Sequence, residues 1–247
     1  MNPPHLIDTH CHIDLFKDPA GIIAEVERQG IYTIAVTNAP FVYRHTAELV
    51  SGCRYVRAAA GLHPELVASH GNQLPMLQPL LKETRYVGEI GLDYSTLDLG
   101  VRQAQRQVFS KILEWCSEDH EKILTVHSRR AASDVISAVN DLRCKVILHW
   151  FSGSNKELDK ALNTGVYFSV NPAMATSIKG SSLISRIPRD RILTESDGPF
   201  VKISGQVADP TAIGAVIHKL GDLWKISIME TRRQIYDNFR ALLKSSQ

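Results

Sequence analysis

Six side chains of types that bind metal ions stand at or just after the ends of short apolar segments. They are His10, His12, Glu89, His127, His149 and Asp197. A polar group at the end of a buried strand is costly unless it has a partner, and this placement recurs along the chain. The recurrence indicates that the strand ends converge, as they do in a closed parallel barrel, where active sites lie at the carboxyl ends of the strands.

The types and spacing of these residues suit divalent ions. His10 and His12 are two positions apart, so on a strand both point to the same face and can bind one ion. Glu89 lies between glycines, and a carboxylate can bridge two ions. Four imidazoles and two carboxylates suit Zn²⁺, Mn²⁺ or Mg²⁺, and two such ions about 3.5–4 Å apart would activate a water molecule. Each residue alone also has a structural interpretation, such as a hydrogen-bonded histidine or a turn aspartate before Gly-Pro.

Further polar and aromatic residues flank the expected site. His63 follows the third apolar segment, and Arg129 follows His127 closely. A guanidinium matches the oxygens of a phosphate, although a loop arginine is also common as a solvated charge. Trp150 and Phe151 follow His149, and they could either stack on a base or pack at the end of the barrel.

The elements that must position these residues follow one another regularly. Strands are expected at 5–9, 31–37, 54–60, 86–90, 122–127, 145–149, 165–170 and 191–195. These segments are mostly apolar, which is typical of strands covered on both faces. Eight strand-then-helix units predict an α/β fold of the (β/α)₈ TIM-barrel class, with residues 1–247 as a single domain.

Helix starts and the final helix carry clear signals. Asp18 and Asp209 each precede a proline, which predicts a capping carboxylate followed by proline at the first helical position. Ser154 with Glu157 and Ser227 with Glu230 have the spacing of capping boxes. A last helix is expected at 228–243, and 201–209 is expected to be a polar, mobile loop.

The composition and net charge of the chain are those of an ordinary globular protein. The chain has 247 residues, 44% of them hydrophobic and 22% charged, with a net charge of +2, so neither strong duplex binding nor a membrane span is indicated. Four widely spaced cysteines suggest buried free thiols. The start of the chain, residues 1–5, lacks the pattern of a secretory signal, and a cytoplasmic location is expected.

Six ordered motifs resemble those of the TatD-type metal-dependent deoxyribonucleases. They are Thr9–Asp14, Gly61–Pro64, Gly88–Tyr94, Val126–Arg129, His149–Ser154 and Glu195–Pro199. The resemblance spans about residues 6–243. It implies a TIM barrel with a two-metal site that hydrolyses DNA phosphodiester bonds.

The resemblance also implies roles for individual residues. His10, His12 and Asp197 match the ligands of one metal, and His127 and His149 match those of the second. Glu89 matches the bridging carboxylate, and Glu89 and Asp197 are the expected catalytic residues. His63 matches a histidine near the substrate phosphate, and Arg129 is expected to contact substrate.

A narrower resemblance points to the TatD-like nuclease component of the Qat anti-phage defence system. It rests on five segments: Val36–Pro40, Ser128–Ala131, His149–Phe151, Tyr167–Pro172 and Ser196–Phe200. It implies partner proteins of that system in addition to DNA. The chain departs from typical TatD sequences at Arg130, Trp150 and Val201–Pro210, which leaves the ligands intact and puts family substrate preferences in doubt.

The sequence therefore predicts a metal-dependent nuclease acting on DNA. Two alternatives remain open from the sequence alone. One is a hydrolase of another ester or amide bond, for example a nucleic-acid-linked ester, and the other is a largely non-catalytic interaction module of a defence complex.

Overall fold

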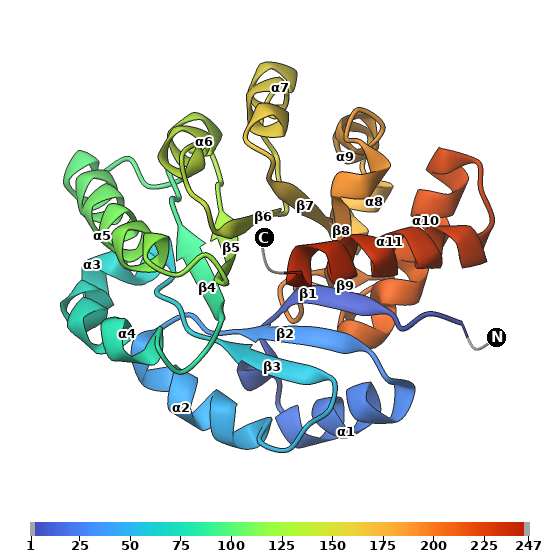
Figure 1. Cartoon of the computed structure of the whole chain (residues 1–247), viewed down its shortest axis with the longest axis horizontal. Helices are drawn as coiled ribbons and strands as arrows, with labels where there is room; N and C mark the ends of the chain where they lie inside the picture. The colour runs from blue at the N-terminus through green and yellow to red at the C-terminus, as the bar shows by residue number, and fades with distance from the viewer. Residues whose placement is uncertain (1–2, 245–247) are drawn as a thin grey trace. The chain divides into compact units, whose positions relative to one another are not determined.

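The computed structural model describes residues 3–244 (Figure 1). The chain divides into two compact units. Unit 1 contains residues 3–35, 49–57 and 168–244, and unit 2 contains residues 36–48 and 58–167. Strands and helices alternate along most of the chain, as predicted. One of the crossings between the units falls within the third strand, β3 (Val56–Ala59).

Unit 1 contains the first and last strands of the repeating pattern. Its strands are β1 (Ile7–Cys11), most of β2 (Tyr32–Val36), most of β7 (Tyr167–Val170), β8 (Ile192–Thr194), β9 (Lys202–Ile203) and β10 (Gln206–Val207). Its α-helices are α1 (Pro19–Gln29), α8 (Pro172–Thr176), α9 (Ile178–Ile184), α10 (Ile213–Trp224) and α11 (Ile228–Leu243). Short 3₁₀ turns cover Ile13–Leu15, Arg189–Arg191 and Pro210–Ala212.

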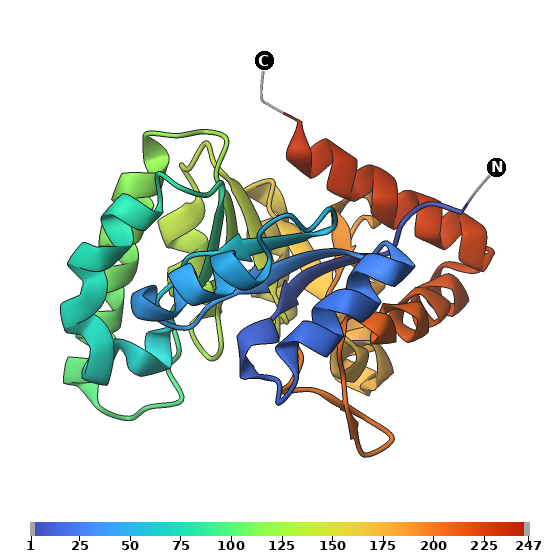
Figure 2. The ribbon, with the colours of Figure 1, turned by 90° about the horizontal axis from the view of Figure 1, so that it is seen from below.

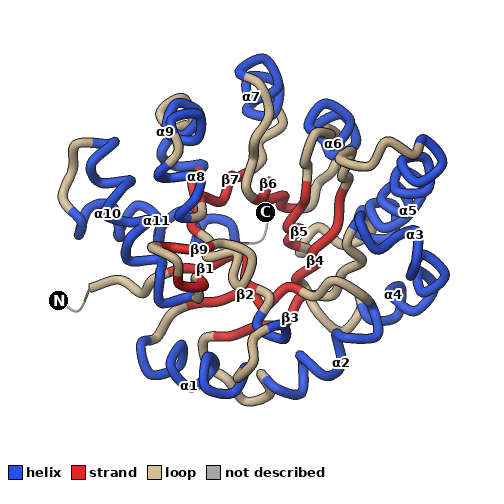
Figure 3. The backbone as a smooth tube through the Cα atoms, turned by 180° about the vertical axis from the view of Figure 1, so that it is seen from behind, coloured by secondary structure: helices blue, strands red, loops and turns tan. Residues whose placement is uncertain are grey.

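Two pairs of neighbouring strands in unit 1 are parallel. β1 pairs with β2 and β7 pairs with β8, and both pairs are parallel. Figure 3 shows β1 beside β2. Hydroxyl groups join β1 to β8: Thr9 Oγ1 donates to the Thr194 carbonyl at 3.1 Å, and Thr194 Oγ1 donates to the Ile7 carbonyl. The first and last strands of the repeat are therefore neighbours.

Unit 2 holds the middle of the repeating pattern. Its strands are β4 (Tyr86–Gly91), β5 (Ile123–His127) and β6 (Lys145–His149). Its α-helices are α2 (Pro40–Leu49, all but its last residue), α3 (Val67–His70), α4 (Leu74–Leu80), α5 (Leu99–Ser117), α6 (Ala132–Val139) and α7 (Asn155–Asn163). Short 3₁₀ turns cover Pro64–Leu66 and Gly71–Gln73.

The three strands of unit 2 are parallel. Tyr86 lies opposite Ile123, and Ile123 lies opposite Lys145, but the register of β4 against β5 shifts between Val87 and Ile90. Figure 1 shows α5, α6 and α7 outside β4, β5 and β6, and the apolar residues of these strands are buried. Because the strands are parallel, their carboxyl ends lie at the same edge of the sheet, which brings Glu89, His127 and His149 together.

Helix signals in the sequence are confirmed. Asp18 accepts a hydrogen bond from Gly21 N, and Asp209 accepts one from Thr211 N. Both capping boxes are present, at the starts of α7 and α11. The last helix spans Ile228–Leu243, as expected, and buries Ile235, Phe239 and Leu242.

The segment after β8 differs from the polar loop expected at 201–209. β9 and β10 form an antiparallel hairpin, and the orange segment that contains them extends outward from its neighbours in Figure 2. Ser204 and Gly205 at its turn have φ values of 50° and 84°, the left-handed pair that a two-residue hairpin turn needs. The Ser-Gly dipeptide was the available sign of this turn.

The structure confirms the α/β, TIM-barrel-like fold class; that residues 1–247 form one domain stays a prediction. All four cysteines are free, and three of them, Cys11, Cys116 and Cys144, are buried. Within residues 3–244, no helix is both long and apolar enough to cross a lipid bilayer. Of the N-terminal segment examined for a secretory signal, residues 1 and 2 lie outside the described residues.

Candidate metal centre

Unit 1 brings together three of the predicted ligands. His10 and Cys11 are the last residues of β1, His12 follows directly, and Asp197 lies three residues beyond the end of β8. The Nε2 atoms of His10 and His12 are 3.2 Å apart, and each lies 3.8 Å from Asp197 Oδ1. All three side chains are buried. They form a group whose ligand atoms converge on one point.

The spacing of these three atoms fits a divalent ion. A triangle with sides of 3.2, 3.8 and 3.8 Å has a centre about 2.1 Å from each corner. Nitrogen and carboxylate oxygen ligands of zinc lie about 2.0–2.2 Å from the metal. The imidazole nitrogens of His10 and His12 face each other beside the Asp197 carboxylate, and this arrangement favours a positive charge between them. Both the types of ligand atom and the distances between them therefore suit a metal ion.

Backbone hydrogen bonds fix this group from both sides. Asp197 N donates to the His10 carbonyl at 2.9 Å, and His12 N donates to the Gly198 carbonyl at 2.8 Å. Asp8 Oδ1 accepts hydrogen bonds from His10 N and Ser196 N. These contacts extend the pairing of β1 with the segment after β8, so the three ligand side chains are held by two strands that lie next to each other.

Asp197 occupies an unusual backbone conformation. Its φ is 49°, in the left-handed region where aspartate and asparagine are more frequent than other non-glycine residues. Such a residue costs about 1–3 kcal/mol and persists where surrounding contacts hold it, often at functional sites. Here the Asp197 N–H contact with His10 is one of those contacts.

Two further buried carboxyls lie beside this group, and sequence reasoning gave neither a role. Burial raises the pKa of Asp8 to about 7. Glu195 is fully buried and accepts hydrogen bonds from Ser169 Oγ and from Asn171 Nδ2, the latter at 3.1 Å. The available signal was their position, because Asp8 lies two residues before His10 and Glu195 two residues before Asp197.

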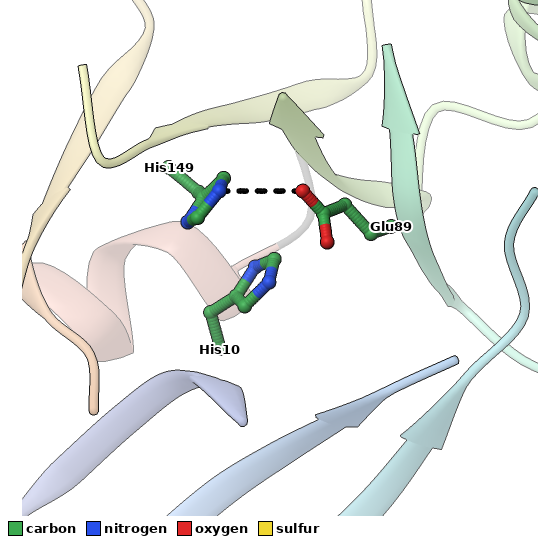
Figure 4. A group of neighbouring side chains, drawn as sticks. All are labelled: His10, Glu89 and His149. Atoms are coloured by element: carbon green, nitrogen blue, oxygen red, sulfur yellow. Dashed lines mark ion pairs between the residues drawn. The ribbon is translucent and has the colours of Figure 1, made fainter. Parts of the chain in front are cut away.

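Unit 2 brings together the other predicted ligands around Glu89. Glu89 Oε1 lies 2.8 Å from His127 Nδ1, 3.3 Å from His149 Nε2 and 3.4 Å from His63 Nε2. Figure 4 shows Glu89 directed toward the His149 ring. Three ring nitrogens around a single carboxylate oxygen make this edge of the sheet a second place that attracts a cation, and His63, Glu89 and His127 satisfy the spacing of a metal-ligand group.

His127 has a carboxylate on each side of its ring. Its Nδ1 faces Glu89, and its Nε2 lies 2.8 Å from Asp93 Oδ2. Burial disfavours a charge on the ring, but the hydrogen bonds with Asp93 and Glu89 raise the pKa of His127 overall. The two carboxylates therefore favour positive charge at this position, whether it is carried by a proton or by a bound metal ion.

Asp93 is the main functional residue that sequence reasoning missed. Burial alone would raise the pKa of Asp93, but hydrogen bonds from His127 and Ser95 lower it below its usual range. An ionised Asp93 accepts a hydrogen bond from His127 Nε2, so that in the neutral ring Nδ1 has the lone pair that a metal ion would use. Asp93 belongs to the Gly88–Tyr94 motif, four residues after Glu89, and that spacing was the only signal.

Close approach of two backbones positions Glu89. A Cβ added at Gly61 would lie only 2.4 Å from Glu89 N and 2.4 Å from Gly88 C. Glu89 N also donates to the Thr37 carbonyl at 3.0 Å. Position 61 therefore has to be glycine for β4 to lie where Glu89 reaches the three histidines.

The contacts of His63 fix which of its nitrogens carries the proton. Its Nδ1 accepts a hydrogen bond from Glu65 N at 3.2 Å, so in a neutral ring Nε2 carries the hydrogen. That Nε2 faces Glu89 Oε1. The arrangement makes His63 a hydrogen-bond donor at the edge of the group in its neutral form, and its expected contact with substrate stays a prediction.

The remaining predicted residues lie at the ends of the strands of unit 2. Arg129 is exposed just after β5, and its carbonyl accepts a hydrogen bond from Tyr94 N at 3.0 Å. Its role toward substrate stays a prediction. Phe151 is buried, whereas Trp150 is 37% exposed, so of the two aromatic residues after His149 only Phe151 packs fully into the protein.

Comparisons with known proteins identify the family of the chain. The family model described as "TatD related DNase" matches residues 7–244. The metal-dependent hydrolase YabD of Bacillus subtilis, itself described as uncharacterised, is 24% identical over 97% of this chain and 99% of its own length. The human deoxyribonuclease TATDN3 is 24% identical over 91% of this chain and 89% of its own.

A solved structure shows the same fold. The crystal structure of YjjV, a TatD homologue from Escherichia coli K12, is similar to this chain with a TM-score of 0.86 and 25% identity. The match covers 96% of this chain and 97% of that one. Together with the match over residues 7–244, it confirms the family and the enzyme class predicted from the motifs: the chain belongs to the TatD related DNase family of metal-dependent hydrolases.

Proposed function

We propose that this protein hydrolyses DNA phosphodiester bonds with two divalent metal ions. The observation that carries the proposal is the group of His10, His12 and Asp197, whose ligand atoms surround a point about 2.1 Å from each of them. The group around Glu89 in unit 2 supports a second ion, with His127 and His149 as its other ligands. Bound divalent ions would polarise the phosphate and lower the pKa of the attacking water.

The protein's own residues supply the remaining steps. Asp197 accepts the proton of the attacking water on a carboxylate oxygen. His63 donates a hydrogen bond from Nε2 to a phosphate oxygen, because its Nδ1 is already occupied by Glu65 N. Arg129 offers its guanidinium to the same phosphate as negative charge builds up. The low net charge of +2 favours action on ends or single strands over coating of long duplexes.

The decisive test is digestion of labelled DNA oligonucleotides with Zn²⁺, Mn²⁺ or Mg²⁺, beside an ester substrate. Asp197→Asn keeps a residue that tolerates the left-handed backbone but removes the charge and the base. We expect it to lower kcat by roughly 10²–10⁴-fold. The matched control is Asp222→Asn, an exposed aspartate of α10, which should leave cleavage unchanged.

Either of two results would overturn the proposal. One is metal-stimulated cleavage that survives Asp197→Asn undiminished. The other is metal-stimulated hydrolysis of the ester with none of the DNA, which would favour the ester hydrolase considered from the sequence.

We further propose that the nuclease acts in the cytoplasm as a component of a Qat-type anti-phage system. Support comes from segments such as Val36–Pro40 and Ser196–Phe200, which resemble that subgroup. A plaque assay in cells carrying the complete system tests this. Protection should be lost with Asp197→Asn and kept with Asp222→Asn, and protection that persists in the first variant would favour an interaction module.

A further inference from the structure

Trp150 combines three features at the edge of the group around Glu89. It directly follows His149, the ligand at the end of β6, and its side chain is 37% exposed. Its φ is 39°, and a left-handed backbone is rare for a bulky residue. The ring centroids of His149 and Trp150 are 6.5 Å apart, with the planes at 79°. The protein therefore retains a strained, exposed indole at the edge of a metal-ligand group.

The next residue accounts for the packing at this turn. Phe151 is 1% exposed, and a Cβ added at Gly153 would lie 2.5 Å from its ring. Phe151 thus anchors the segment after β6 in the interior.

A similar arrangement occurs in unit 1. Phe200 is 59% exposed, and its ring lies edge-on to His12 with centroids 5.0 Å apart and planes at 86°. Each metal-ligand group therefore has, within its own unit, an exposed aromatic ring in contact with one of its histidines. Exposed aromatic rings beside a phosphate-binding centre are what single-stranded nucleic acid binds through stacking of its bases.

We propose that Trp150 is a substrate-binding residue that stacks on a nucleobase next to the cleaved phosphate. The proposal rests on the function proposed above and names a substrate contact for it. Stacking uses the flat face of the base, so it tolerates any base but requires an unpaired one. The 37% exposure of Trp150 leaves part of the residue accessible to a base, while its edge-on position against His149 keeps it beside the group around Glu89.

Fluorescence offers a readout of this contact that does not depend on cleavage. The chain has three tryptophans. Trp224 is buried, and Trp115 lies on α5 against Lys111. A short oligodeoxythymidylate with phosphorothioate linkages, which resist hydrolysis, should quench the fluorescence of the metal-loaded protein. The quenching should vanish in Trp150→Phe and persist in Trp115→Phe, the matched control.

Binding affinity tests the stacking itself. Trp150→Ala should bind the same oligonucleotide about 5- to 150-fold more weakly, as removal of a stacking partner does. Trp150→Phe keeps an aromatic ring and should lose much less. An oligonucleotide with abasic residues should bind wild type weakly and should bind Trp150→Ala equally weakly, because the indole and the base act only together. Thermal unfolding of each variant checks that the fold is intact.

The outcomes separate the two proposals. DNA cleavage by wild type, together with unchanged affinity in Trp150→Ala, would overturn the stacking role and leave the nuclease function standing. Quenching assigned to Trp150 without metal-stimulated cleavage would support the stacking role and overturn the hydrolysis. An equal loss of affinity on removing the bases in wild type and Trp150→Ala would also overturn the stacking role.

Discussion

At the scale of single residues, a carboxylate behind His127 determines which of its ring nitrogens is directed at Glu89. Asp93 accepts a hydrogen bond from His127 Nε2 and so leaves Nδ1 directed at Glu89. Backbone and side-chain contacts hold Asp93 in turn: Ser95 N donates to its Oδ1 at 2.7 Å, and its own N–H donates to Gln105 Oε1 at 3.0 Å. The orientation of the His127 ring therefore depends on Asp93, which follows β4, and through it on Gln105 of α5.

Asp93→Asn tests this dependence. The amide keeps the size of the side chain but loses the charge that stabilises the Nε2 proton, and such changes lower metal affinity by about 10- to 100-fold. Competition with a fluorescent chelator should show one weakened site. Asp141→Asn, an exposed aspartate after α6, is the control, and equal affinities in the two variants would contradict the role of Asp93.

At the scale of elements, the position of β4 depends on the absence of a side chain opposite it. Gly61 follows β3 and lies against the peptide that joins Gly88 to Glu89. The strand can approach this closely only because position 61 has no Cβ. The same close approach recurs at Gly91, where an added Cβ would lie 2.1 Å from the His127 carbonyl oxygen.

Gly61→Ala is therefore expected to be destabilising. The added methyl group has to displace the backbone of β4, and overpacking of this kind costs about 1–3 kcal/mol of unfolding free energy. Metal affinity should fall as well, because Glu89 moves with the strand. Urea denaturation and metal titration measure the two effects.

The control variant for Gly61→Ala is expected to change the unfolding free energy in the opposite direction. Gly214 lies in α10, and a Cβ added there meets no other atom within 4 Å. Gly214→Ala should raise the unfolding free energy by about 0.5–1 kcal/mol through helix propensity. A Gly61→Ala protein as stable as wild type would show that β4 can shift at little cost.

At the scale of the whole molecule, the repeating strand-helix pattern was readable because each strand is a short apolar run. β6 spans Lys145–His149, the range expected from sequence, and α11 also has its expected bounds. β1 was placed two residues too early, because its last residues include the polar His10. The hydrophobic pattern thus fails at the functional end of the strand, where polar residues occupy buried positions.

The supporting contacts of the site were less predictable than its ligands. Ligand types at strand ends carry a chemical signature, whereas the link between Asp93 and His127 depends on the path of the chain after β4. Gln105 illustrates the same limit: it is buried in α5, and its Nε2 donates to the Pro64 carbonyl at 3.1 Å. A polar residue within a helical sequence gives no sign of such a partner.

Metal removal should lower the stability of the whole protein. A ligand present at about 100 times its dissociation constant raises the free energy of unfolding by about 2.7 kcal/mol. For a chain of this length, this corresponds to a rise of roughly 5–10 °C in Tm. Scanning calorimetry with and without EDTA measures the change, and re-addition of Zn²⁺, Mn²⁺ or Mg²⁺ identifies the ions that restore it. Asp197→Asn should show a smaller change, and an identical shift in both proteins would argue against Asp197 as a ligand.

The left-handed backbone at Asp197 limits how this enzyme's ion preference could be re-engineered. A cysteine or glutamate there would add a new donor but would also have to adopt a conformation in which aspartate and asparagine are better tolerated. A designer who seeks a softer coordination sphere would therefore do better to vary His10, which lies on β1 and does not have a positive φ. The shape of the chain, as much as its chemistry, restricts which ligands can be exchanged.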